Sequence, residues 1–267
     1  MGHEADVTMN DERPAEKRTS VAGSGHGKWD GTLTLLNQRV AQDPKNAASW
    51  TNRGILLRIL ADYEGASRDF REALRLDPSS VHALLGQGDL YLALHRYSEA
   101  IEAYNTAIAL DPERSSSYLH RGSGYVEQGR HAEAIADFTK SADLEPGWSQ
   151  PYFRRASARN DVKDFQGALS DYDTFFRLER KSSELIGEAH GLRAFIYMRL
   201  GRYREAIADY DVELQLTPRD AIAYIARSRA HQKAGNHARA AEDRKKAIQL
   251  DPTIREWEGG ARDESGA

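Results

Sequence analysis

The chain contains 267 residues and no cysteine, and its 37 basic and 41 acidic side chains give a formal net charge of −4. The lack of cysteine excludes disulfides, thiol catalysis and cysteine–zinc sites, and the net charge offers no bulk attraction to nucleic acid. No apolar run approaches the length of a membrane span and residues 1–28 lack the apolar core of a signal peptide, so we expect a cytoplasmic protein.

Residues 1–28 carry almost no large apolar side chain, and we expect them to form a disordered tail. The run GSGHGK in this tail resembles part of a phosphate-binding loop. However, Ala22 stands where the first glycine of that motif belongs, and Trp29 stands where Ser or Thr belongs. No predicted strand precedes the run either, so we interpret it as a flexible linker.

Apolar residues at helical spacing predict a helix from about Asp30 to Gln42, which Asp43-Pro44 ends. From there the sequence repeats every 34 residues, and a proline marks the end of almost every unit. The interval from Pro146 to Pro218 is two periods plus four extra residues. Full repeats are expected at 47–80, 81–114, 115–148, 149–182, 187–220 and 221–254.

Each repeat divides into two amphipathic helices, with a small residue in the first helix and alanine and an aromatic residue in the second. In repeat 81–114 the defining positions hold Leu84, Gly88, Tyr91, Ala100, Tyr104, Ala107 and Pro112. This pattern resembles the tetratricopeptide repeat (TPR) family. The resemblance implies an all-α, right-handed α-solenoid of stacked helix–turn–helix repeats, with about six full repeats and an N-terminal half-repeat. The solenoid is expected to span 29–258, followed by a disordered tail at 259–267.

Two repeats depart from the pattern. Repeat four has Arg180 where proline belongs, and no helix breaker lies between Gln166 and Ile186, so its second helix is expected to run long. Repeat six has Arg244 in the aromatic column. A solvated side chain at that position suits the last unit of a stack.

Comparison of the repeats shows two charged columns sixteen residues apart, an arginine in the first helix and an aspartate in the second. Five of the six repeats carry both residues, whereas repeat two has Gln87 and Ala103. Because both are lost together, we expect the columns to be in contact, and a structural ion pair is favoured over ligand binding. The pairs are Arg53–Asp69, Arg121–Asp137, Arg155–Asp171, Arg193–Asp209 and Arg227–Asp243.

The sequence contains no recognisable catalytic or metal-binding pattern. The nine histidines include no His-Glu-x-x-His spacing, and His231 and His237 occupy columns that hold Tyr or Phe elsewhere, which favours packing roles. Ser123 lies between two glycines but lacks the Gly-x-Ser-x-Gly elbow. We therefore expect a non-enzymatic protein without cofactor or metal.

In TPR proteins the variable stripe of the first helices lines a concave groove, and this resemblance suggests where a partner would bind. One column of the stripe is mostly apolar, and basic residues flank it in the C-terminal half. If the apolar side chains are exposed they are binding anchors; the alternative is that they pack between adjacent first helices. The candidate groove residues are Asn52, Leu85, Leu119, Phe153, Arg154, Arg199, Ile225 and Arg229.

These residues suit a protein or peptide ligand with hydrophobic anchors and an acidic or carboxylate end. The two-carboxylate clamp of some relatives is not matched, because Ser116 and His120 stand where Lys and Arg are expected. The predicted function is therefore a protein-interaction scaffold. The alternatives are a self-associating scaffold, joined through its end repeats or residues 176–187, and an RNA-binding helical-repeat protein. The net charge of −4 disfavours the last of these.

Overall fold

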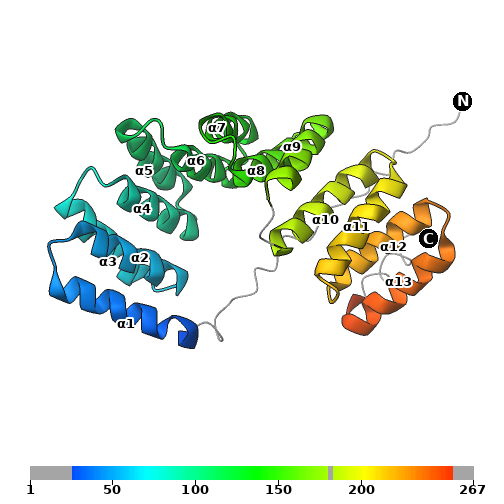
Figure 1. Cartoon of the computed structure of the whole chain (residues 1–267), viewed down its shortest axis with the longest axis horizontal. Coiled ribbons are helices and arrows are strands. Elements are labelled where there is room, and N and C mark those ends of the chain that lie inside the picture. The colour runs from blue at the N-terminus through cyan, green and yellow to red at the C-terminus, as the bar shows by residue number, and fades with distance from the viewer. Residues whose placement is uncertain (1–25, 180–182, 255–267) are drawn as a thin grey trace, which may run out of the picture. The chain divides into compact units, whose positions relative to one another are not determined.

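The computed structural model describes residues 26–179 and 183–254, and within these residues it contains thirteen α-helices and no strand (Figure 1). Of the predicted tails at 1–28 and 259–267, residues 1–25 and 259–267 lie outside the described residues, as do residues 255–258. The helices fall into two compact units, the first ending at Pro78 and the second beginning at Ser79.

The first unit is a three-helix array. Its helices are α1 (His26–Gln42), α2 (Ala47–Ile59) and α3 (Tyr63–Leu76), and α2 packs against both of the others. The side chain of Asn46 caps α2 by accepting a hydrogen bond from the Ser49 amide. Because α1 begins at His26, the predicted linker at residues 23–28 is wrong for its last three residues.

The second unit holds five helix pairs. They are α4 (Val81–Ala93) with α5 (Tyr97–Leu110), α6 (Ser115–Glu127) with α7 (His131–Leu144), α8 (Ser149–Asp161) with α9 (Phe165–Leu178), α10 (Ser183–Arg199) with α11 (Tyr203–Leu216), and α12 (Ala221–Lys233) with α13 (His237–Leu250). Each first helix packs on its own second helix and contacts the neighbouring first helices of the unit, and α6, α8, α10 and α12 also pack on the second helix before them. The predicted all-α repeat solenoid is therefore confirmed.

The turn between the two helices of each repeat uses one residue in the left-handed region. Gly129, Gly201 and Gly235 have φ values of 70°, 69° and 80°, as expected for the usual helix stop. The other three repeats place Ala61, His95 and Lys163 there, with φ values of 61°, 57° and 63°. The same backbone turn is thus kept where the sequence lacks glycine, at some cost in strain.

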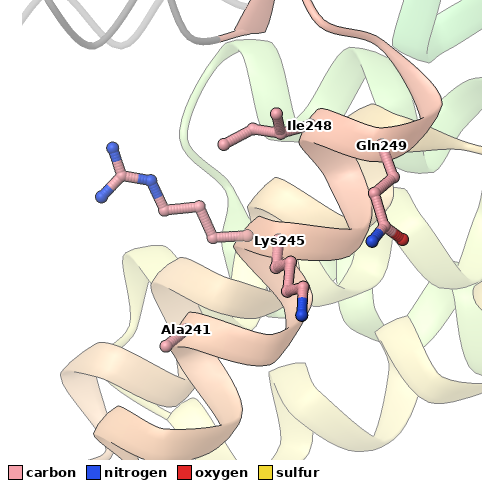
Figure 2. A pocket seen from close by; sticks show the side chains of 5 residues that line it. Ala241, Lys245, Ile248 and Gln249 are labelled. Carbon is pink, nitrogen blue, oxygen red and sulfur yellow. The ribbon is translucent and has the colours of Figure 1, made fainter.

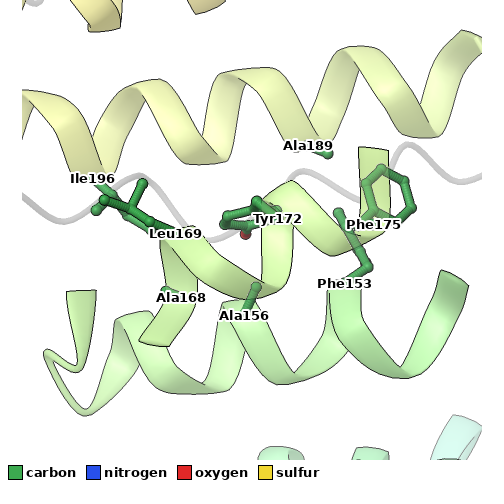
Figure 3. Packing of buried hydrophobic residues seen from close by; sticks show 8 residues of the cluster. All are labelled: Phe153, Ala156, Ala168, Leu169, Tyr172, Phe175, Ala189 and Ile196. Atoms are coloured by element: carbon green, nitrogen blue, oxygen red, sulfur yellow. The ribbon is translucent and has the colours of Figure 1, made fainter. Parts of the chain in front are cut away.

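In the first five repeats the core joins a small residue of the first helix to an aromatic ring of the second. A Cβ atom added to Gly122 would lie 2.6 Å from Cε1 of Phe138, so only glycine lets this ring approach the helix. The ring itself is 1% exposed. The largest cluster, shown in Figure 3, joins α8, α9 and α10 and consists of Phe153, Ala156, Ala168, Leu169, Tyr172, Phe175, Ala189 and Ile196.

The four extra residues lengthen a first helix rather than a second one. Helix α9 ends at Leu178 after 14 residues, like the other second helices of this unit, whereas α10 has 17 residues against 13 in the other first helices. The prediction of a long second helix in repeat four is therefore wrong. The backbone of Glu179 is already extended, so the helix ends without the proline that its sequence lacks.

Candidate functional site

The predicted arginine–aspartate columns form bidentate ion pairs with buried aspartates, in the five repeats that carry both residues. In repeat three, Arg121 Nε and Nη2 each donate to one carboxylate oxygen of Asp137 at 2.7 Å. The five aspartates of the column are 2–6% exposed. This geometry recurs in all five repeats that carry the pair, so the predicted contact between the columns is confirmed.

The same arginines also bridge to the preceding repeat. In repeat three the third nitrogen, Arg121 Nη1, donates to the Asn105 side chain on α5 at 2.7 Å. In repeat six Arg227 Nη1 donates to Asp211 on α11, also at 2.7 Å. Equivalent bonds join Arg155 to Thr139 and Arg193 to Asp173. Each of these guanidiniums therefore links the second helix of its own repeat to the second helix of the repeat before it.

Repeat two replaces the missing pair with a different polar cluster. The Tyr104 hydroxyl donates to Asp89 Oδ1 at 2.8 Å, and His120 Nδ1 of the next repeat lies 2.7 Å from the same oxygen. Asp89 lies two residues along α4 from Gln87, which stands in the arginine column. An inter-repeat polar contact is thus kept with other residues, which the column comparison did not foresee.

Repeat five adds a histidine to its ion pair. His190 Nδ1 lies 2.8 Å from Asp209 Oδ1, and the His190 ring stacks on Phe176 at 4.2 Å between centroids. Burial alone would raise the pKa of Asp209, but the hydrogen bonds from Arg193 and His190 outweigh it and lower the pKa of this carboxyl. Asp209 is therefore held as a structural carboxylate and is not poised for proton transfer.

The apolar column predicted to line the groove is mostly core. Leu85, Leu119 and Phe153 are 7%, 8% and 4% exposed, so the expectation that they are exposed anchors is wrong. Leu119 and Phe153 cluster with buried residues of the second helix of their own repeat. Phe153, for example, lies 5.4 Å from Phe175 and 6.2 Å from Tyr172 between ring centroids. The structure thus supports burial of this column, but the ring contacts of Phe153 are with the second helix of its own repeat, whereas the alternative interpretation placed the column between adjacent first helices.

Repeat five shows why a glycine is tolerated in that column. A Cβ atom added to Gly191 would lie 2.6 Å from Cδ of Glu213, whose side chain from α11 fills the space. In repeat four the two equivalent positions hold Phe153 and Phe175, in contact with each other. The column is therefore buried in repeats two to five, by different combinations of side chains, and is half-buried at Ile225 in repeat six.

The remaining predicted groove residues are accessible. Asn52, Arg154, Arg199 and Arg229 are exposed and Ile225 is half-buried. Asn52 belongs to the first unit and the others to the second, so the structure does not bring the whole set together. A peptide-binding role for them stays a prediction.

Two of these arginines lie on neighbouring first helices, α10 and α12, which contact each other. Along α12 the positions 222, 225, 229 and 233 are three or four residues apart and thus share one helical face. Positions 195 and 199 do the same on α10. We call this surface the α10–α12 face, and it comprises Phe195, Arg199, Ile222, Ile225, Arg229 and Lys233.

The α10–α12 face combines apolar and basic side chains. Ile222 is 55% exposed and is the most exposed large hydrophobic residue of the described chain. The three basic residues are all exposed, and the Arg199 guanidinium lies 6.0 Å from the Phe195 ring centroid. Phe195 and Ile222 were not among the candidate groove residues predicted from the sequence. The spacing of Ile222, three residues before Ile225 and seven before Arg229, would have placed Ile222 on the same helical face.

Within residues 26–179 and 183–254, no group of His, Cys, Asp and Glu side chains could hold a metal ion. In the same part of the chain, no helix is both long and apolar enough to cross a membrane.

Comparisons with known proteins agree with the fold. The curated protein sperm-associated antigen 1 of Homo sapiens is 32% identical over 92 residues, which is 34% of this chain and 10% of that protein. A chain of the APC/C hetero-tetramer Cut9–Hcn1 has a TM-score of 0.71 and 20% identity, over 85% of this chain and 44% of that one. YrrB, described as a TPR protein with an unusual peptide-binding site, has a TM-score of 0.53 and 18% identity, over 70% of this chain and 95% of that one.

The chain thus spans only a tenth of the curated relative and less than half of the Cut9–Hcn1 chain. A family model described as tetratricopeptide repeat matches residues 60–115 and 85–151, and two further models of that description match residues 187–220 and 221–254. Together these stretches cover more than half of the sequence, and the protein belongs to the tetratricopeptide repeat family.

Proposed function

We propose that this protein is a non-enzymatic interaction module that binds a peptide segment of a partner protein on the α10–α12 face. TPR proteins generally act as protein-interaction scaffolds, and YrrB, which shares the fold, is described as having a peptide-binding site. The single observation that carries the proposal is the pairing of exposed apolar and basic side chains on two adjacent first helices.

The chemistry of the face favours a ligand with apolar anchors and an acidic end. Ile222 and Ile225 supply apolar area that water now covers at least in part, and burying it under a ligand is favourable. Arg199, Arg229 and Lys233 supply three cations to meet carboxylates, where charge-assisted hydrogen bonds are stronger than neutral ones. The structural arginines of the ion-pair columns are engaged inside the stack, so they do not compete for such a ligand.

The test uses a fluorescent peptide with two leucines followed by three glutamates, and a matched peptide with three lysines in place of the glutamates. We expect the acidic peptide to bind the full chain and the basic one not to bind. The double variant Arg199→Ala/Arg229→Ala should weaken binding of the acidic peptide at least tenfold, equivalent to about 1.4 kcal/mol. The affinity of the unmodified chain for the acidic peptide should also fall with added salt, because exposed charges are screened.

A matched control is the double variant Arg204→Ala/Arg239→Ala, which removes two exposed arginines from the second helices α11 and α13. This control should bind the acidic peptide like the unmodified chain. Equal losses in the two double variants, or equal binding of the acidic and basic peptides, would show that the α10–α12 face is not the site.

A further inference from the structure

The charge of the second unit changes sign along its repeats. Residues 81–148 hold five basic and ten acidic side chains, whereas residues 221–254 hold seven basic and three acidic ones. At the basic end, an open pocket on α13 is lined by Arg244 and Lys245 together with three uncharged side chains of that helix, and Figure 2 shows Lys245 projecting from it. The two ends of the array therefore attract ligand groups of opposite charge.

The last residues of the first helices follow the same change of sign. Helix α4 ends at the uncharged Ala93, whereas α6, α8, α10 and α12 end at Glu127, Asp161, Arg199 and Lys233, all of them exposed. These helices follow one another along the unit, each in contact with the next (Figure 1). Because the first helices of stacked repeats run in the same direction, their ends lie along one edge. We call Glu127, Asp161, Arg199 and Lys233 the charged edge.

Helix stability alone accounts for only half of the charged edge. The dipole of a helix favours a cation at its C-terminal end and disfavours a carboxylate there. Arg199 and Lys233 therefore stabilise their own helices, whereas Glu127 and Asp161 do not. Oδ2 of Asp161 lies 3.5 Å from Nδ1 of His131 on α7, but the Asp161 side chain is still 41% exposed, so a ligand cation can reach it.

The charged edge adjoins apolar side chains that a ligand could cover. Val126 and Met198 precede Glu127 and Arg199 in the sequence, and both are half-buried. Packed helices lie about 8–10 Å apart, and an extended chain advances about 3.3 Å per residue. An extended segment lying along the edge would thus pass from one first helix to the next about every three residues.

We propose that the charged edge binds an extended partner segment whose charge changes sign along its length, with basic residues at α6 and α8 and acidic residues at α10 and α12. The inference rests on the proposed function, because Arg199 and Lys233 belong to the α10–α12 face as well. It adds the order of charges in the ligand. A segment with the opposite order would place like charges against each other at every step, and such contacts are unfavourable.

Three capped fluorescent peptides of the same composition test this order. Two carry their charges in blocks, Lys-Ser-Leu-Lys-Ser-Leu-Glu-Ser-Leu-Glu and the reverse sequence, and the third alternates them as Lys-Ser-Leu-Glu-Ser-Leu-Lys-Ser-Leu-Glu. None has a net charge, so a difference in affinity reports the arrangement alone. We expect one block peptide, the one whose chain direction matches the groove, to bind at least about fivefold tighter than the alternating peptide.

The double variant Glu127→Gln/Asp161→Asn should remove this preference, leaving the block and alternating peptides within about twofold of each other. The acidic peptide of the preceding test should bind this variant at least as tightly as it binds the unmodified chain. The matched control is Glu102→Gln/Glu242→Gln, which changes two exposed carboxylates on the second helices α5 and α13. This control should keep the preference for the block peptide.

The outcomes separate this inference from the proposed function. Equal affinities for the block and alternating peptides, with the acidic peptide still bound, would overturn the order of charges and leave the α10–α12 face as a site. If none of the peptides bound, both proposals would be wrong. Light scattering that showed a dimer without peptide binding would assign the surface to a second copy of the chain and overturn the inference in the same way.

Discussion

At the scale of single residues, the arginine column links neighbouring repeats through one side chain with five donors. Two nitrogens of Arg121 donate hydrogen bonds to Asp137 within the repeat, and the third donates to Asn105 of the preceding repeat. The planar fork of arginine fits this task, since it presents several donors in fixed directions. Loss of such a residue therefore removes a local pair and an inter-repeat contact at the same time.

This arrangement predicts that Arg121→Ala destabilises the protein by about 1.5–3 kcal/mol, the range for lost hydrogen bonds to a charged group. The substitution leaves Asp137, which is 6% exposed, without its ion-pair partner. The control is Gln87→Ala, which changes the same column in the repeat that lacks the aspartate and should cost less than about 0.5 kcal/mol. Chemical denaturation of both variants gives the comparison. Small and equal effects would mean that the ion pairs contribute little to stability.

At the scale of helices, the close approach of the two members of a repeat depends on where glycine or alanine stands. Gly122 and Gly124 lie on the same turn of α6 but have different neighbours. A Cβ atom at Gly122 would meet Phe138 at 2.6 Å, whereas one at Gly124 would meet Ile101 at 3.3 Å. The first distance requires the helices to separate or the ring to move, and the second requires a shift of a few tenths of an ångström in a flexible side chain.

We therefore predict different changes in stability for the same Gly→Ala substitution at these two positions. Gly122→Ala should destabilise by about 1–3 kcal/mol through overpacking, although alanine is the better helix former. Gly124→Ala should be close to neutral, because the gain in helix propensity of up to about 1 kcal/mol offsets the mild crowding. Thermal unfolding followed by circular dichroism would measure both. A stabilised Gly122→Ala variant would contradict the packing that the structure shows.

The sequence was sufficient to predict which residues repeat and which columns touch, but not which face of a helix water reaches. The contact of Arg121 with Asp137 was predictable because both columns change together in repeat two. Burial of Leu119 and Phe153 was not, because helical spacing shows that a residue faces a neighbour without showing how deep it lies. The left-handed turn residue His95 gave no signal either, since only glycine is expected at such a position from its own chemistry.

At the scale of the whole molecule, each unit is a linear array in which a repeat contacts only its neighbours. Stability in such arrays is approximately the sum of repeat and interface contributions, so a local defect has a local effect. The α8–α9–α10 cluster around Phe153 lies in the middle of the second unit and joins two repeats across the irregular spacing. It is the place where the coupling along the array can best be tested.

We predict that Phe153→Ala destabilises the protein by about 3–5 kcal/mol, because it removes a buried ring that contacts Tyr172 and Phe175. Its neighbour Arg154 is exposed, so Arg154→Ala should change stability by less than about 0.5 kcal/mol and serves as the control. Amide hydrogen exchange should show the loss of protection concentrated in α8, α9 and α10, with α4, α5, α12 and α13 changed much less. If Phe153→Ala had no effect, the ring would have to be at the surface. If instead protection fell equally in all ten helices, the second unit would unfold as one cooperative block, and the description of repeats coupled only to their neighbours would be wrong.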